Sequence, residues 1–147
     1  MIDQAAGLRA RLSDTSRPPG THAATTPLMV VGPEQCIATV RQLLQHWHEA
    51  GYRWVGEPGA WQLVPVSAQS SHLAALASQQ PRWALWVDRD ADAFRRGLAT
   101  LTRLHQNGGP RRLLAVHHPG LPRRGLLDNL HQVAASRLGI DLLVLAR

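Results

Sequence analysis

Lysine is absent from this 147-residue sequence, and cysteine occurs only once. All 16 basic residues are therefore arginine, a pattern typical of a GC-rich coding sequence as well as of an arginine-rich binding surface. The single cysteine, Cys36, excludes an internal disulfide. Its place on an apolar helix face predicts an inert core thiol.

Long apolar runs are also missing. No stretch approaches the roughly 18 residues that span a bilayer. The first residues lack the basic start and apolar core of a secretory signal. We therefore expect a cytoplasmic protein without a membrane span, and its length is typical of one domain with one core.

The positive charge is confined to one half of the chain. Residues 1–81 hold five arginines and five acidic residues, whereas residues 82–147 hold eleven arginines and five aspartates, which accounts for the whole net charge of +6. Such asymmetry indicates nucleic acid or an acidic protein as a partner. However, no tryptophan follows Trp86 to supply base stacking. The candidate basic surface consists of three pairs, Arg95 and Arg96, Arg111 and Arg112, and Arg123 and Arg124.

Composition divides the chain near residue 27. Residues 2–12 place Ile2, Ala5, Leu8 and Leu12 roughly on one face of a short helix. Residues 13–27 are rich in Ser, Thr, Pro and Gly, as in a linker. We therefore interpret residues 1–27 as a tail or docking segment and residues 28–147 as a single domain.

Strand and helix patterns alternate from residue 28 to the end. Short apolar runs bounded by Gly, Pro or Asp predict strands, and three- and four-residue apolar spacings predict helices. In the helix that follows the central strand, Phe94, Leu98, Leu101 and His105 form the expected inward stripe. Such alternation predicts an α/β, three-layer domain with a mostly parallel sheet of about five strands, flavodoxin-like or receiver-like. The predicted strands cover 28–31, 53–55, 62–66, 83–87, 113–116 and 141–145, and the helices 34–50, 70–80, 92–106 and 124–138, with a possible hairpin at 53–66.

Function in such sheets gathers at the carboxyl ends of the strands. Asp88 leaves the central strand and His117 leaves the next one, which makes them candidates for acid–base or metal chemistry. Glu34 and Asp90 complete an acidic cluster, although Asp90 and Asp92 also suit helix capping.

Motifs for cofactors and metals are lacking. Neither GxxxxGK[ST] nor GxGxxG occurs, so we expect no cofactor. His46 and His48 are two residues apart and point to different helix faces, so we expect no metal there. No catalytic residue is assigned from sequence alone, and an enzyme is the less favoured interpretation.

The passage from Leu76 through Trp83-Ala84-Leu85-Trp86-Val87 to Asp88 resembles the helix, strand and aspartate of a response-regulator receiver domain. That resemblance places Asp88 at the phosphoacceptor position. It also implies a degenerate receiver, because only Glu34 stands for the acidic pair that holds Mg²⁺. His117 replaces the usual Ser or Thr, and Arg147 replaces the usual lysine.

The chain is also similar in plan to restriction-endonuclease-like folds, with Glu57-Pro58 and Asp88-Arg89-Asp90 at the catalytic acids. That family requires a lysine, which is absent, so the resemblance implies an inactive nucleic-acid-associated domain that uses its arginine-rich half. Our first prediction is instead a non-catalytic, receiver-like module that binds another protein in a bacterial regulatory or assembly system.

Overall fold

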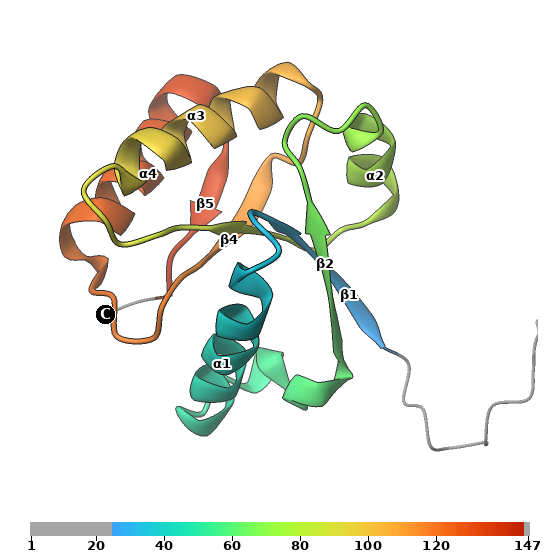
Figure 1. The fold of residues 1–147 in the computed structure, drawn as a ribbon, viewed down its shortest axis with the longest axis vertical. Helices are drawn as coiled ribbons and strands as arrows, with labels where there is room; N and C mark the ends of the chain where they lie inside the picture. The colour runs from blue at the N-terminus through green and yellow to red at the C-terminus, as the bar shows by residue number, and fades with distance from the viewer. Residues whose placement is uncertain (1–24, 146–147) are drawn as a thin grey trace, which may run out of the picture.

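The computed structural model describes residues 25–145 and contains one five-stranded, all-parallel sheet in the order β2-β1-β3-β4-β5 (Figure 1). The predicted three-layer α/β fold is confirmed. The strands are β1 (Thr26–Val31), β2 (Trp61–Val66), β3 (Trp83–Trp86), β4 (Arg112–Val116) and β5 (Asp141–Leu143). The helices are α1 (Cys36–Glu49), α2 (Leu73–Gln79), α3 (Ala93–Gln106) and α4 (Asp128–Val133).

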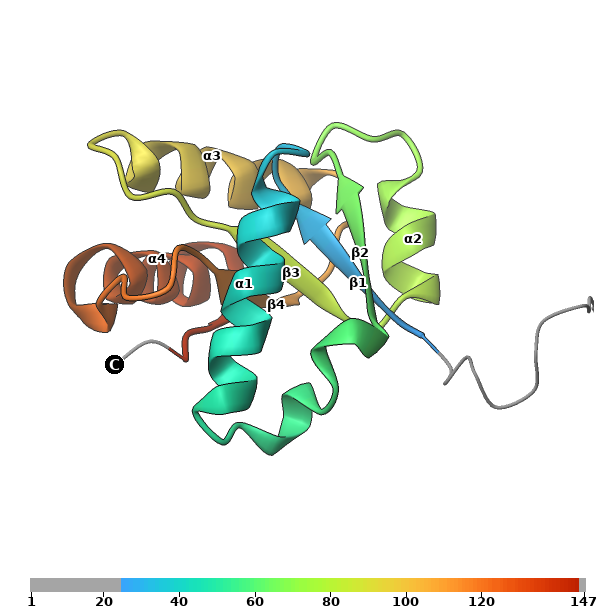
Figure 2. The ribbon, with the colours of Figure 1, turned by 60° about the horizontal axis from the view of Figure 1, so that its bottom comes forward.

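The strand order decides which face each helix covers. Right-handed crossovers place a helix on one face when the chain steps one way along the sheet, and on the other when it steps back. The step from β1 to β2 runs one way, and the steps from β2 to β3, β4 and β5 run the other way. Consequently α1 alone lies on one face, and α2, α3 and α4 share the opposite face (Figures 1 and 2).

The two faces of the sheet carry apolar layers of different size, because three helices cover one face and only α1 covers the other. The larger layer packs β-strand residues such as Leu85 and Leu113 under Leu73 of α2, Leu101 of α3 and Leu130 of α4. The smaller layer packs the other side of the sheet against α1, through the residues Leu28, Val30, Val40, Leu43, Leu44, Trp47, Trp61, Leu63, Ala84 and Val116. Both faces of β1, β3 and β4 are thus apolar, as expected for buried parallel strands.

The predicted strand at 53–55 is wrong. Residues Arg53–Val55 form a 3-10 turn, and a second such turn covers Pro58–Ala60. The Trp61 indole Nε1 donates a 2.7 Å hydrogen bond to the Val55 carbonyl, which fixes the first turn beneath the start of β2. Because β2 pairs in parallel with β1, residues 53–66 form no hairpin.

The inward stripe of α3 also differs from the prediction. Its buried residues are Ala93, Gly97, Leu101 and Leu104, whereas Phe94 and Leu98 are only partly buried and His105 is exposed. A Cβ at Gly97 would lie 3.0 Å from Leu130 Cδ1 on α4, so glycine permits a close approach of the two helices. Hydrophobic periodicity does not detect such contacts because alanine and glycine carry little apolar signal.

The remaining boundaries lie close to those predicted. β1 begins at Thr26, so Thr26 and Pro27 of the expected tail belong to the sheet. The helical region that includes α4 ends at Gly139, whose φ of 65° suits glycine, as the sequence predicted. Among residues 25–145, no helix has the length and apolarity needed to cross a membrane.

Candidate functional site

Asp88 follows β3 at the carboxyl edge of the sheet and is held by two side chains from neighbouring elements. Arg96 Nη2 of α3 lies 3.5 Å from Asp88 Oδ2, and His118 Nε2 lies 3.9 Å from Asp88 Oδ1. The geometry therefore brings His118, rather than the sequence candidate His117, to this carboxylate. Because the Arg96 guanidinium supplies the positive charge beside Asp88, a divalent cation would have to compete with it.

The other acidic candidates do not converge on Asp88. Asp90 pairs with Arg96, whose hydrogen bond lowers the pKa of Asp90 and raises that of Arg96. Asp92 occupies the N-cap position of α3 without a side-chain capping bond, and Glu34 is exposed in the turn before α1. In residues 25–145, no three His, Cys, Asp or Glu side chains are arranged to hold a metal ion.

Trp86 and Cys36 pack against Gly32 at the crevice between β1 and β3, where the strand order reverses. Ligands in doubly wound sheets bind at this switch point. Here a Cβ at Gly32 would lie 2.7 Å from Trp86 Cβ and 3.4 Å from Cys36 Sγ, so the carboxyl end of β1 packs directly on β3. The Trp86 ring also contacts His118 edge to face, with centroids 5.2 Å apart. Glycine at residue 32 thus serves packing rather than phosphate binding.

Cys36 is a core thiol, as the sequence predicted. It is 3% exposed, and burial raises its pKa to about 11. The thiolate, which is the nucleophilic form, is therefore scarce at neutral pH.

His117 is buried against α1 instead of facing the carboxyl edge. Its ring contacts Trp47 edge to face at 6.1 Å, and Nδ1 lies 2.9 Å from the His118 carbonyl. That carbonyl fixes the proton on Nδ1, because an oxygen acceptor needs a donor. Burial lowers the pKa of His117, so the ring is neutral, and Nε2 has no protein partner among the described residues. His117 is therefore a buried histidine whose ring packs against Trp47 and also lines a pocket with Leu43 and Tyr52.

The six arginines of the candidate basic surface lie at two opposite edges of the sheet. Arg95 and Arg96 begin α3, and Arg123 and Arg124 follow β4, so these four lie toward the carboxyl edge, whereas Arg111 and Arg112 lie where β4 begins. Four of them approach carboxylates: Arg95 approaches Asp92, Arg96 approaches Asp88 and Asp90, Arg112 approaches Asp141, and Arg123 approaches Asp128.

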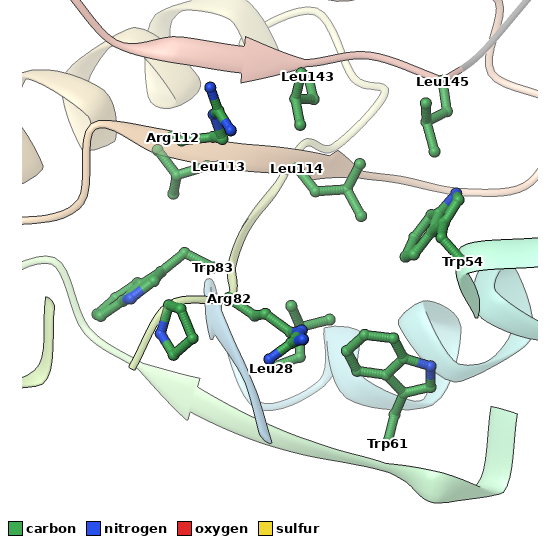
Figure 3. A pocket seen from close by; sticks show the side chains of 11 residues that line it. Leu28, Trp54, Trp61, Arg82, Trp83, Arg112, Leu113, Leu114, Leu143 and Leu145 are labelled. Carbon is green, nitrogen blue, oxygen red and sulfur yellow. The ribbon is translucent and has the colours of Figure 1, made fainter. Parts of the chain in front are cut away.

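An apolar groove of about 370 Å³ opens on the α1 face of the sheet, beyond the strip that α1 covers (Figure 3). Its floor includes Leu28, Leu114 and Leu143, from β1, β4 and β5. Trp54 and Trp61 form one end of the groove, and Arg82 and Arg112 add positive charge elsewhere in its lining. Pro81, Trp83, Leu113 and Leu145 complete the lining.

The groove contains the two large apolar side chains that are most exposed among the described residues. Trp54 is 45% exposed and Leu143 is 42% exposed. Trp54 packs edge to face on Trp61, with centroids 6.2 Å apart, and is tilted against Trp47 at 5.7 Å. The indole is therefore held in place at the groove rather than free in solvent.

The sequence did not reveal this groove. Leu143 is part of an apolar run that is typical of a strand buried on both sides. Trp54 belongs to the predicted strand 53–55, which is a 3-10 turn in the structure. The groove follows from the strand order, because the order 2-1-3-4-5 puts a single crossover helix, α1, on one face of a five-stranded sheet.

No family model, curated protein or solved structure matches this chain significantly.

Proposed function

We propose that this domain is a non-catalytic protein-binding module, whose apolar groove receives an amphipathic helix of a partner protein. The observation that carries this proposal is the part of the α1 face that lies beyond α1, toward β5, where Trp54 and Leu143 stay exposed. Exposed apolar surface that is rimmed by polar residues is typical of protein-interaction sites. Tryptophan and arginine, which both line this groove, are enriched among residues that dominate binding energy.

The carboxyl edge supports a non-catalytic role. Arg96 lies beside Asp88, Trp86 packs against Gly32 at the switch point, and the Cys36 thiol is protonated. His117 is neutral and packed away from Asp88. These residues therefore do not form an arrangement in which a nucleophile and a base face an open position for a substrate.

The all-parallel sheet in the order 2-1-3-4-5 supports the receiver-like interpretation over the nuclease-like one. The nuclease-like interpretation relied on a hairpin at residues 53–66, which the sheet does not contain. In a degenerate receiver-like domain, the ion pair between Arg96 and Asp88 leaves the phosphoacceptor position unused. Such a domain suits a constitutive binding role in a regulatory or assembly system. The separation and pairing of the arginines argue against a continuous nucleic-acid surface.

The groove favours a helix with acidic flanks. A helix presents apolar side chains at i, i+3, i+4 and i+7 to a groove, and the floor offers aliphatic side chains to receive them. Arg82 is exposed, and the Arg112 side chain is 76% exposed although its Nε lies 3.4 Å from Asp141 Oδ2. Their guanidinium groups complement Asp or Glu beside the apolar stripe of the partner.

A displayed library of helix-forming peptides tests this function. Peptides are selected for binding to the full chain, and the same pools are measured on Leu143→Glu, which buries a charge under the bound helix. The control is Ala99→Glu, which adds the same charge at an exposed position of α3 on the opposite face. We expect selected peptides to have helical apolar spacing and to lose at least about tenfold in affinity, or about 1.4 kcal/mol, on Leu143→Glu only. Selection of no peptide that depends on Leu143 would contradict the proposed function.

A further inference from the structure

The groove lies beside the point where the N-terminal segment joins the sheet. Leu28, which lines the groove, is the third residue of β1, and residues 1–24 precede the described part of the chain. The segment is therefore tethered at the groove itself. Because neighbouring strands are about 4.8 Å apart, β5 lies only roughly 14 Å from β1 across the sheet.

The predicted linker is long enough to return the first residues of the chain to the groove. Residues 13–25 reach at most roughly 45 Å when fully extended. That length exceeds the distance from β1 to any part of the floor. A tether that easily spans its site gives an effective concentration on the order of millimolar.

The sequence of residues 2–12 supplies an apolar face of the kind that the groove accepts. At about 100° per residue, Ile2, Ala5, Leu8 and Leu12 fall on one side of a helix, and Ala10 falls nearly opposite Leu8. An isolated helix of this length is marginal in water. Gly7 weakens it further by about 1 kcal/mol relative to alanine. A helix here thus depends on an apolar surface to pack against.

We propose that residues 2–12 dock in the groove of their own chain and cover Trp54 and Leu143 until a partner helix displaces them. This inference rests on the proposed function and names a regulator of that same groove. Residues 2–12 carry Asp3 against Arg9 and Arg11, so they have no acidic excess to match Arg82 and Arg112. The tethered segment is held by proximity, and an acidic partner helix has the better charge match and displaces it.

Disulfide trapping in the full chain tests this arrangement. Leu8→Cys is combined with Leu143→Cys, and the matched control combines Ala10→Cys with Leu143→Cys. Leu143 is already 42% exposed, so its replacement leaves the core intact. The buried Cys36, with its raised pKa of about 11, does not compete for mild oxidation. Both proteins are oxidised with glutathione disulfide at low micromolar concentration and followed by non-reducing electrophoresis and intact mass.

We expect an intramolecular disulfide that forms at least tenfold faster in the protein with Leu8→Cys than in the control with Ala10→Cys. Equal rates would show that the tether brings residues 2–12 near the groove without docking one helix face in it. Predominantly intermolecular disulfides would identify a second copy of the chain as the occupant. The absence of any disulfide would show that residues 2–12 do not reach the groove. Each of these three results overturns the proposal.

Acrylamide quenching of Trp54 in the full chain provides a second measurement without new cysteines. The Trp54 signal is obtained by difference against Trp54→Phe. We expect Leu8→Glu to raise the Trp54 quenching constant at least twofold and Ala10→Glu to leave it unchanged, and identical quenching in both would refute docking. Failure of docking leaves the peptide result on Leu143→Glu intact. Failure of peptide selection on Leu8→Glu, in which the segment is undocked, together with successful trapping in the double-cysteine protein, would instead reject the proposed function and keep the docked segment.

Discussion

Replacing Gly32 with alanine tests how tightly the carboxyl edge of the sheet is closed. The new Cβ would lie 2.7 Å from Trp86 Cβ, whereas carbon atoms in contact are normally about 3.5–4.0 Å apart. Both atoms are attached directly to the backbones of adjacent elements, so neither can rotate away. The chain has to separate by roughly 1 Å at the end of β1.

The expected cost is that of overpacking, about 1–3 kcal/mol in the free energy of unfolding. At roughly 4 °C per kcal/mol for a domain of this size, the melting temperature should fall by about 4–12 °C. Urea unfolding followed by far-UV circular dichroism measures the change. Gly59→Ala is the control, because a Cβ at Gly59 meets nothing within 4 Å.

Two results would separate this explanation from its alternatives. The cost of Gly32→Ala should persist in a Trp86→Ala background, because the collision is between Cβ atoms and not with the indole ring. A Gly32→Ala protein within about 0.5 kcal/mol of the wild type would refute the closed switch point, since that is the range of neutral surface substitutions. That result would make the crevice between β1 and β3 a candidate ligand site again.

Three further predictions concern the other candidate groups. The pKa of His117 is lowered in the folded state, so the unfolded chain takes up the proton at a higher pH than the folded protein does. The free energy of unfolding should therefore be constant above the ordinary pKa of 6.5. As the pH drops below 6.5, it should decrease by up to about 1.4 kcal/mol per pH unit. Urea midpoints between about pH 7.5 and 5 should show this slope in the wild type and a smaller one in His117→Leu, and equal slopes would contradict it. Beryllofluoride with Mg²⁺ should leave Trp86 emission unchanged, and a saturable response lost in Asp88→Asn would restore a working phosphoacceptor. Duplex DNA should bind only in or above the roughly 10⁻⁴ to 10⁻⁶ M range of non-specific binders at about 150 mM salt, as measured by fluorescence anisotropy. Submicromolar affinity that falls on joint replacement of Arg111 and Arg112 by alanine would favour the nucleic-acid function.

The sequence by itself determined the fold class, because local patterns report burial on both sides of a strand. The run Trp83–Val87 carries no polar alternation, and β3 lies at the centre of the sheet. The helix spacing of Val40, Leu44 and Trp47 likewise located the buried side of α1. Periodicity was less successful in α3, where close helix packing buries Gly97, a residue with no apolar side chain to count.

Only the tertiary structure decided which candidate residues meet. Asp88 and His117 both stand just after strands, but the backbone turns His117 toward Trp47 and His118 toward Asp88. Adjacent residues in an extended segment point to opposite sides, so a shift of one position exchanges their partners. The apolar groove also depends on tertiary structure, because it arises from the order in which strands far apart in the chain pair. Local sequence patterns carry no information about that order, and so they cannot show which sheet face the crossover helices leave open.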